Sequence, residues 1–83
     1  MKNLFFTVGE MLDNQRIPRD HIGYEYLRDV LMAKGNCLKT IYFRVAGNFV
    51  TTPQRVEDKI KEAISLGIMR RANEISKLHN RHG

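Results

Sequence analysis

Hydrogen-bonding side chains that could recognise a nucleic acid are concentrated in the segment 50–67, VTTPQRVEDKIKEAISLG. Arginine binds guanine through O6 and N7, a carboxylate accepts from cytosine N4, and lysine and threonine contact phosphates. If the segment is helical, a rotation of 100° per residue places several polar residues opposite its apolar positions. These residues are Gln54, Asp58, Lys61, Glu62 and Ser65, with Arg55 at the edge of the same face. The same charges also suit an ordinary helix that faces water, so the residue types leave both interpretations open.

The segment carries its own signals for the start and the end of a helix. Thr52 is a suitable N-cap, and Pro53 fits the first helical position. The apolar positions that follow form one stripe: Val56, Ile60, Ala63 and Ile64. We expect Gly67 to allow close packing and to interrupt the helix. A short final helix at about 71–78 and a frayed tail should follow.

Helical periodicity also covers most of the remaining chain. Thr7 and Glu10 form a capping box for a first helix, which should end before Pro18 because proline disfavours helical geometry at the preceding residue. Two further helices are expected at about 22–34 and 38–49. Strand signals are almost absent. The sequence therefore predicts an all-α fold, a small bundle of four to five helices.

The expected organisation is a single domain, 1–83, with a helix-turn-helix at about 38–66. In such a motif the first helix braces the second, whose capped start meets phosphates while its first two turns face base edges. A plain helical hairpin has the same sequence pattern, however. The pattern alone does not separate the two.

Composition limits the classes of function. The net charge is +5, and residues 1–38 are neutral, so the whole excess lies in residues 39–83 and favours a polyanionic partner there. The single cysteine, Cys37, excludes an internal disulfide and suits the cytoplasm, which is the expected location. No apolar run approaches the ~20 residues of a membrane span. Neither a nucleophile with a partnered base nor a phosphate-binding glycine loop is recognisable. We therefore expect no enzyme, no cofactor and no metal site.

A family resemblance adds to this pattern. The runs HIGYEYLRDVL and LKTIYFRVAGNFVTTPQRVEDKIKEAI resemble the C-terminal DNA-binding domain of the master response regulator of endospore formation in Firmicutes. The similarity covers residues from about 17 to 70 in one register. The residues that carry it are Gly23, Tyr24, Tyr26, Leu27, Arg28, Lys39, Thr40, Tyr42, Ala46, Phe49, Thr51, Thr52, Arg55, Val56, Glu57, Ile60, Ala63 and Ile64, with Phe43 where the family often has proline.

The resemblance implies an all-helical effector domain that binds short promoter elements through the helix starting at Thr52. It also implies that Arg55 and Glu57 lie on the DNA-facing side. The chain departs from the family at Asp58, where arginine is typical, and at Glu62, where histidine is typical. These carboxylates imply either an altered base preference or weakened DNA binding, because each acid repels phosphate. The sequence is also shorter than the family's domain and has no receiver domain before it, so we expect a shortened effector module without a phosphorylation switch.

The predicted function is sequence-specific binding of double-stranded DNA by a transcriptional regulator, with no membrane and no small-molecule substrate involved. Base contacts are expected from Gln54, Arg55, Glu57, Asp58 and Glu62. Phosphate contacts are expected from Lys39, Thr51, Thr52, Lys59 and Lys61. The alternative is a protein-interaction module that binds or antagonises a related regulator without strong DNA binding. A homodimer or such a regulator is the expected protein partner.

Overall fold

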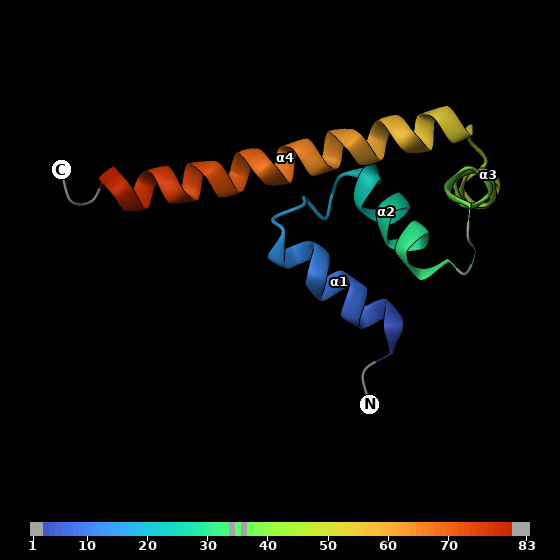
Figure 1. Cartoon of the computed structure of the whole chain (residues 1–83), viewed down its shortest axis with the longest axis horizontal. Coiled ribbons are helices and arrows are strands. Elements are labelled where there is room, and N and C mark those ends of the chain that lie inside the picture. The colour runs from blue at the N-terminus through green and yellow to red at the C-terminus, as the bar shows by residue number, and fades with distance from the viewer. Residues whose placement is uncertain (1–2, 34, 36, 81–83) are drawn as a thin grey trace.

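The described part of the chain is an all-α bundle of four helices, as the periodicity predicts. The computed structural model describes residues 3–33, 35 and 37–80. Residues 79 and 80 are described by their backbone alone. The helices are α1 (Leu4–Asn14), α2 (Ile22–Met32), α3 (Leu38–Asn48) and α4 (Pro53–Asn80). Figure 1 shows the first three gathered along one part of the long α4. The described residues contain no strand.

Helix α2 holds the bundle together, because it packs against α1, α3 and α4. Two groups of buried side chains fill the bundle, and Leu27 of α2 packs against both. The first group is Val8, Leu12, Ile17, Tyr24 and Ala63. The second is Tyr26, Val45, Ala46, Val56 and Ile60. The edge of the Tyr26 ring meets Phe49 with the ring centroids 4.9 Å apart, a favourable aromatic arrangement.

Helix α1 begins earlier than the capping-box pattern predicts. Asn3 is the N-cap, and its side-chain oxygen accepts a hydrogen bond from the Phe6 N–H at 2.9 Å. Thr7 is therefore inside the helix, where its hydroxyl donates back to the Asn3 carbonyl. The prediction of a Thr7–Glu10 capping box is wrong, because an asparagine four residues upstream caps as well as threonine and adds a turn.

The interruption predicted at Gly67 is also wrong, because α4 is continuous over 28 residues. A glycine costs a helix only about 1 kcal/mol relative to alanine, which packing can offset. Gly67 is buried against the connector between α1 and α2, where a Cβ would lie 2.7 Å from the Gln15 carbonyl oxygen and 3.1 Å from Ile17 Cγ1. The predicted close packing at this glycine is thus confirmed.

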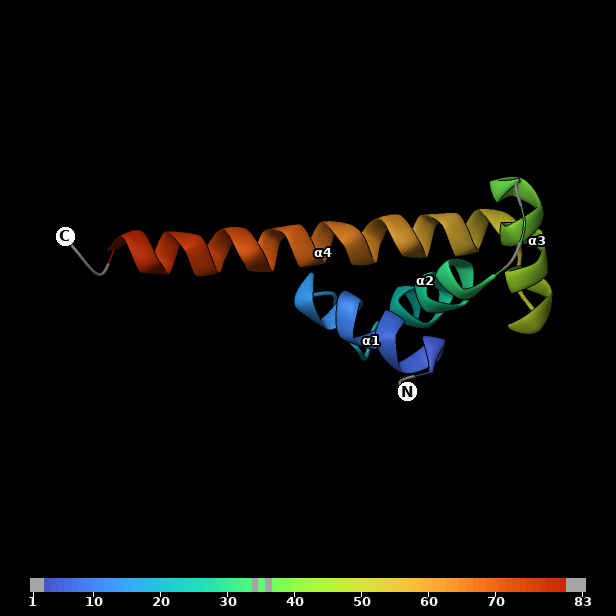
Figure 2. The same ribbon diagram turned by 60° about the horizontal axis from the view of Figure 1, so that its bottom comes forward.

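The second half of α4 extends beyond the other three helices (Figures 1 and 2). Arg16, in the connector, reaches it through an ion pair of 3.1 Å to Glu74. The separate last helix and the frayed tail after residue 78 do not occur up to Asn80, and residues 81–83 lie outside the described part of the chain. Helix α2 ends at Met32, two residues before the predicted Lys34, which is likewise outside the described residues.

The turn between α3 and α4 begins with a Schellman motif. The Val50 N–H donates to the Gly47 carbonyl at 3.3 Å, and the Thr51 N–H donates to the Ala46 carbonyl at 2.9 Å. The motif needs a left-handed backbone at residue 50, and Val50 has a φ of 53°. A β-branched residue is strained in this conformation, and Val50 offsets none of the strain by packing because it is 93% exposed.

Val50→Gly is therefore expected to raise the free energy of unfolding by about 0.5–1 kcal/mol, since glycine adopts a positive φ without strain. Urea denaturation would measure the gain. Val50→Ala should give a smaller gain, because alanine keeps the unfavourable Cβ. A Val50→Gly variant that is less stable than the wild type would contradict the strain assigned to this turn.

Candidate nucleic-acid interface

Helix α3 and the turn after it hold the beginning of α4 in a defined position. Val45 and Ala46 of α3 pack against Val56 and Ile60 of α4 in one buried group. The outer face of α4 over the same turns is left to solvent. In Figure 1, α3 is seen end-on beside the first turns of α4. The two helices therefore form a braced pair with a capped helix start exposed beside the turn, as a helix-turn-helix requires.

Thr52 caps α4 as predicted. Its hydroxyl oxygen accepts a hydrogen bond from the Arg55 N–H at 3.2 Å, and its carbonyl accepts from the Val56 N–H at 3.1 Å. Pro53 occupies the first helical position. The positive end of the helix dipole lies here, which favours a nearby anion such as a phosphate.

Arg55 is the exposed basic residue of this helix start that remains unpaired. Its guanidinium makes no ion pair with any acid among the described residues. It borders a shallow hollow on the surface of α4, whose other lining residues are Thr52, Gln54, Asp58, Lys59 and Glu62. Five of the predicted DNA contacts and Arg55 itself thus come together on one surface.

The three acids of these turns are all engaged, but with different partners. Glu57 pairs with Lys61 at 3.1 Å, and this bond raises the pKa of the Lys61 ammonium above its usual value. Asp58 accepts a hydrogen bond from the Gln54 amide at 2.9 Å, so its partner is neutral. Asp58 therefore has no direct ion pair among the described residues, although its charge helps to raise the pKa of the nearby Lys61 ammonium.

The carboxylate of Glu62 bonds to two side chains. It accepts from His21 Nε2 at 3.0 Å and pairs with Lys59 at 3.3 Å. The bonds from His21 and then Lys59 lower the pKa of the Glu62 carboxyl. Glu62 is thus bound to the start of α2, and does not extend freely from the exposed face as the helical projection implied.

His21 is a residue of this surface that sequence reasoning missed. The Gly23 N–H donates to His21 Nδ1 at 2.9 Å, which makes His21 the N-cap of α2. A ring nitrogen that accepts carries no proton, so the neutral ring has its hydrogen on Nε2, and that hydrogen is donated to Glu62. The available signal was the position of a histidine immediately before the expected start of a helix.

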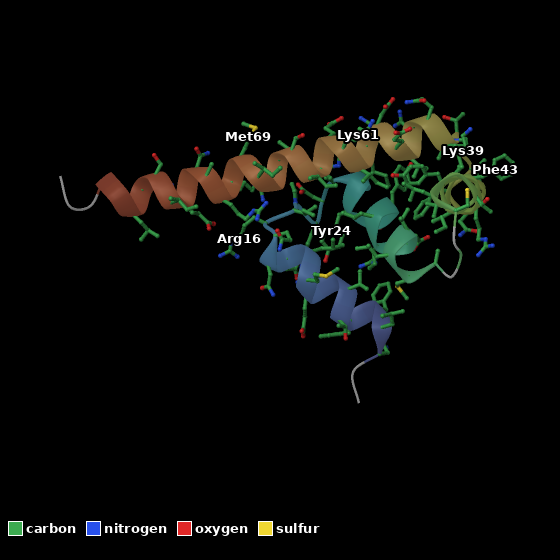
Figure 3. All side chains as sticks on the ribbon, viewed as in Figure 1. Arg16, Tyr24, Lys39, Phe43, Lys61 and Met69 are labelled. Carbon is green, nitrogen blue, oxygen red and sulfur yellow. The ribbon has the colours of Figure 1, made fainter. Side chains whose placement is uncertain are left out.

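Lys39 and Thr51 belong to different elements, Lys39 to the first turn of α3 and Thr51 to the turn between α3 and α4. Lys39, near the start of α3, lines a mainly apolar depression with Thr40, Phe43 and Pro53, at the end of the molecule where α3 meets α4 (Figure 3). Phe43 is 72% exposed there. Thr51 is half-buried and its N–H is used by the Schellman motif, so only its side chain can contact a ligand.

Comparison with known proteins identifies the family. Residues 8–82, nearly the whole chain, match the family described as the sporulation initiation factor Spo0A C terminal. No solved structure matched the chain. Within the described residues, none of the helices combines the length and apolar character needed to cross a membrane. The family is one of regulatory domains and not of enzymes. The chain therefore belongs to the Spo0A C-terminal family, the DNA-binding effector domain of a sporulation regulator.

Proposed function

We propose that the protein is a cytoplasmic transcriptional regulator that binds double-stranded DNA sequence-specifically as a single helical domain, with the first turns of α4 in the major groove. The observation that carries the proposal is the exposed, unpaired guanidinium of Arg55 at the capped start of this helix. A planar guanidinium that is not occupied by an acid is available for bidentate bonds to guanine O6 and N7. The packing of α3 against α4 supports the proposal, because a recognition helix must keep a fixed orientation relative to the DNA backbone.

Three residues are the primary base contacts in this proposal. Arg55 would donate to guanine, and Asp58 would accept from cytosine N4 while Gln54 bonds an adjacent base edge. The combination favours G·C pairs in the target. Glu57 and Glu62 would reach a base only after giving up their bonds to Lys61 and His21, respectively, so they are assigned a secondary role.

The proposed phosphate contacts surround this face. The DNA phosphates nearest the turn between α3 and α4 would be bound by Lys39 and by the hydroxyls of Thr51 and Thr52. Lys59 and Lys61 are held by acids of their own helix, at 3.3 and 3.1 Å. Exposed ion pairs of this kind contribute only about 0–1 kcal/mol, so phosphates can compete for both lysines.

Selection of bound fragments from random duplex DNA, at two salt concentrations, tests the proposal. We expect an enriched motif with at least one dominant G·C pair, and an affinity that falls as salt rises because counterions are released on binding. Salt-sensitive binding without any enriched motif would contradict sequence-specific recognition.

The second candidate function is a protein-interaction module that binds or antagonises a related regulator. It is favoured by the carboxylate of Asp58, whose hydrogen-bond partner Gln54 is neutral, and by apolar side chains exposed along the extended part of α4, namely Ile68, Met69, Ile75 and Leu78. Exposed apolar side chains on one helix are typical of contact sites. The double substitution Asp58→Arg with Glu62→His separates the two functions. A large gain in duplex binding would favour this alternative, whereas the loss of an enriched motif would support Asp58 as a base contact.

A further inference from the structure

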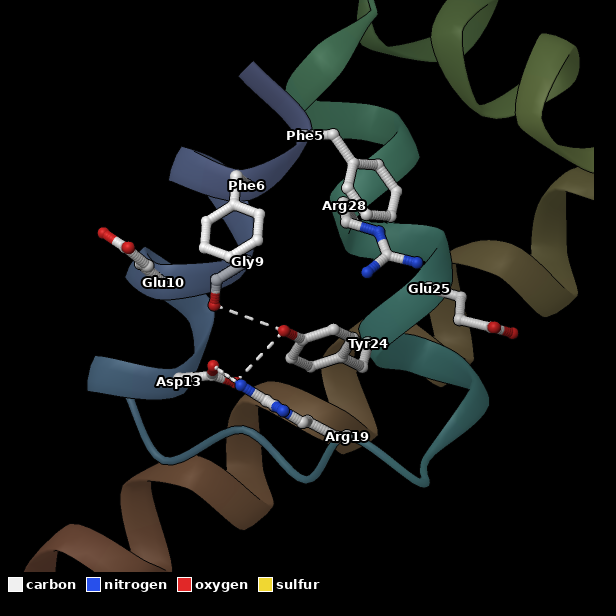
Figure 4. A pocket seen from close by; sticks show the side chains of 9 residues that line it. All are labelled: Phe5, Phe6, Gly9, Glu10, Asp13, Arg19, Tyr24, Glu25 and Arg28. Atoms are coloured by element: carbon white, nitrogen blue, oxygen red, sulfur yellow. Dashed lines mark hydrogen bonds and ion pairs between the residues drawn. The ribbon is translucent and has the colours of Figure 1, made fainter. Parts of the chain in front are cut away.

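A cavity of about 360 Å³ lies between α1 and α2, apart from the residues assigned to DNA binding. Figure 4 shows Phe6 and Gly9 of α1 on one side and Tyr24 and Arg28 of α2 on the other, with the ring of Phe5 beside Arg28. Phe5 and Phe6 are about half exposed, so aromatic surface lines the entrance. The volume is within the range of small-molecule sites, which start at about 300 Å³.

Arg28, which lines this cavity, has a buried hydrogen-bond donor without an acceptor in the described part of the chain. Its guanidinium carbon lies 3.9 Å from the Phe5 ring centroid and 5.5 Å from that of Tyr24. The Nε atom is buried, and it has no acceptor among the described residues. No ion pair of Arg28 is formed within the same part of the chain. Buried donors are nearly always satisfied, so an unsatisfied one at a cavity indicates a missing acceptor.

The other polar groups at the bottom of the cavity already satisfy one another. Arg19 forms a two-bond ion pair with Asp13. The Tyr24 hydroxyl is 3.1 Å from Asp13 Oδ1 and 3.2 Å from the Gly9 carbonyl, and it donates to these two acceptors. The bond from Arg19 lowers the pKa of the Asp13 carboxyl, which therefore stays charged. The guanidinium of Arg28 is thus the group of this cavity whose N–H donors are not used by the other described lining residues.

We infer that the cavity binds a single carboxylate that carries an apolar group. The carboxylate would take two parallel bonds from the Arg28 fork, and Phe5 and Phe6 would pack on the apolar part. A larger polyanion does not fit, because the carboxylates of Glu10, Asp13 and Glu25 also line the site. The ligand chemistry has two sources: a free organic acid, or the terminal carboxyl of a peptide that ends in an apolar residue.

Titration of the ¹⁵N-labelled full chain with 3-phenylpropionate tests the inference. We expect the amide resonances of Phe5, Gly9 and Arg28 to shift, and no comparable shifts with 3-phenylpropan-1-ol, which lacks the carboxylate. Arg28→Lys keeps the charge but not the fork, and should weaken binding about tenfold. Arg70→Lys, on the exposed part of α4, is the matched control and should leave binding unchanged.

A second arm distinguishes the two sources of the carboxylate. A tetrapeptide ending in phenylalanine is titrated with its carboxyl free and with it amidated. Tighter binding of the free-carboxyl peptide than of 3-phenylpropionate assigns the site to a protein terminus, and the reverse order assigns it to a small acid. If Arg28→Lys fails to fold, Phe6→Ala replaces it as the test variant. Phe6 is at an exposed position, and its loss should weaken the binding of both probes. Equal binding by alcohol and acid, or no binding by either carboxylate, would overturn the inference.

Discussion

Gly23→Ala is expected to lower the free energy of unfolding by about 3 kcal/mol or more, the largest loss for an added methyl group at any of the described glycines. Gly23 of α2 is buried where α2 crosses α4. A Cβ there would lie 2.1 Å from the Lys59 carbonyl oxygen and 2.7 Å from Ala63 Cβ. The carbonyl belongs to the helix backbone and cannot rotate away, so the two helices must separate. Urea denaturation followed by circular dichroism measures the loss.

The same substitution at Gly47 provides the control. Gly47 is exposed in α3, its φ is not positive, and no atom lies within 4 Å of an added Cβ. Gly47→Ala should therefore stabilise the protein by about 0.5–1 kcal/mol through the higher helix propensity of alanine. If the two variants had the same unfolding midpoint, the close crossing of α2 and α4 at Gly23 would be refuted.

Arg55→Ala is expected to weaken binding to the selected DNA motif by about 1–3 kcal/mol, roughly 5- to 150-fold, and to relax the preference at one G·C position. The physical reason is the loss of a bidentate donor that is not paired with any acid in the described part of the chain. Fluorescence anisotropy with the motif and with single-base variants measures both effects. Arg55→Lys should lose most of the base preference while it keeps the salt dependence, because lysine retains the charge but not the fork.

Lys61→Ala is the companion measurement for a phosphate contact. It should weaken binding to all sequences alike and reduce the slope of log affinity against log salt by about 1. In this variant Glu57, which pairs with Lys61 at 3.1 Å, loses its partner, and its free carboxylate repels the DNA phosphates. The double variant Lys61→Ala with Glu57→Gln removes this repulsion, so it measures only the lost attraction between Lys61 and phosphate. An equal loss on every sequence for Arg55→Ala would refute its role in base recognition.

Most of the helical framework was predictable because it depends on local spacing. Val56, Ile60 and Ala63 of the predicted apolar stripe are buried in the structure, as a period of three to four residues requires, whereas Ile64 at the edge of the stripe is 40% exposed. The Thr52 cap is also local, since the hydroxyl bonds an N–H three residues away. The start of α1 was missed although the signal was local: Asn3 competes with Thr7 as a cap, and the earlier cap adds a turn.

The residues of the candidate interface stay a prediction, and the structure adds how their side chains are connected. A helical projection places Asp58 and Glu62 on the same polar face, and both are exposed. It cannot tell that Glu62 bonds to His21, 41 residues earlier in the chain. That bond exists because α2 crosses α4 at Gly23, which brings the cap of one helix beside the carboxylate of the other. Glu62 would have to give up this bond to contact a base, so we propose Asp58 as the first of the two acids to do so.

The sequence by itself determined the all-α class, the helix that follows the cap at Thr52 and the residues available for DNA recognition, because each depends on neighbours within about one helical turn. Only the tertiary structure decided that α4 continues through Gly67 and that Glu62 is bound by His21. It also decided that Arg28 Nε is buried without an acceptor among the described residues. These features depend on distances between helices. The size of the side chains at each helix crossing sets how closely two helices approach. The pattern of residues along one helix does not show where it crosses another.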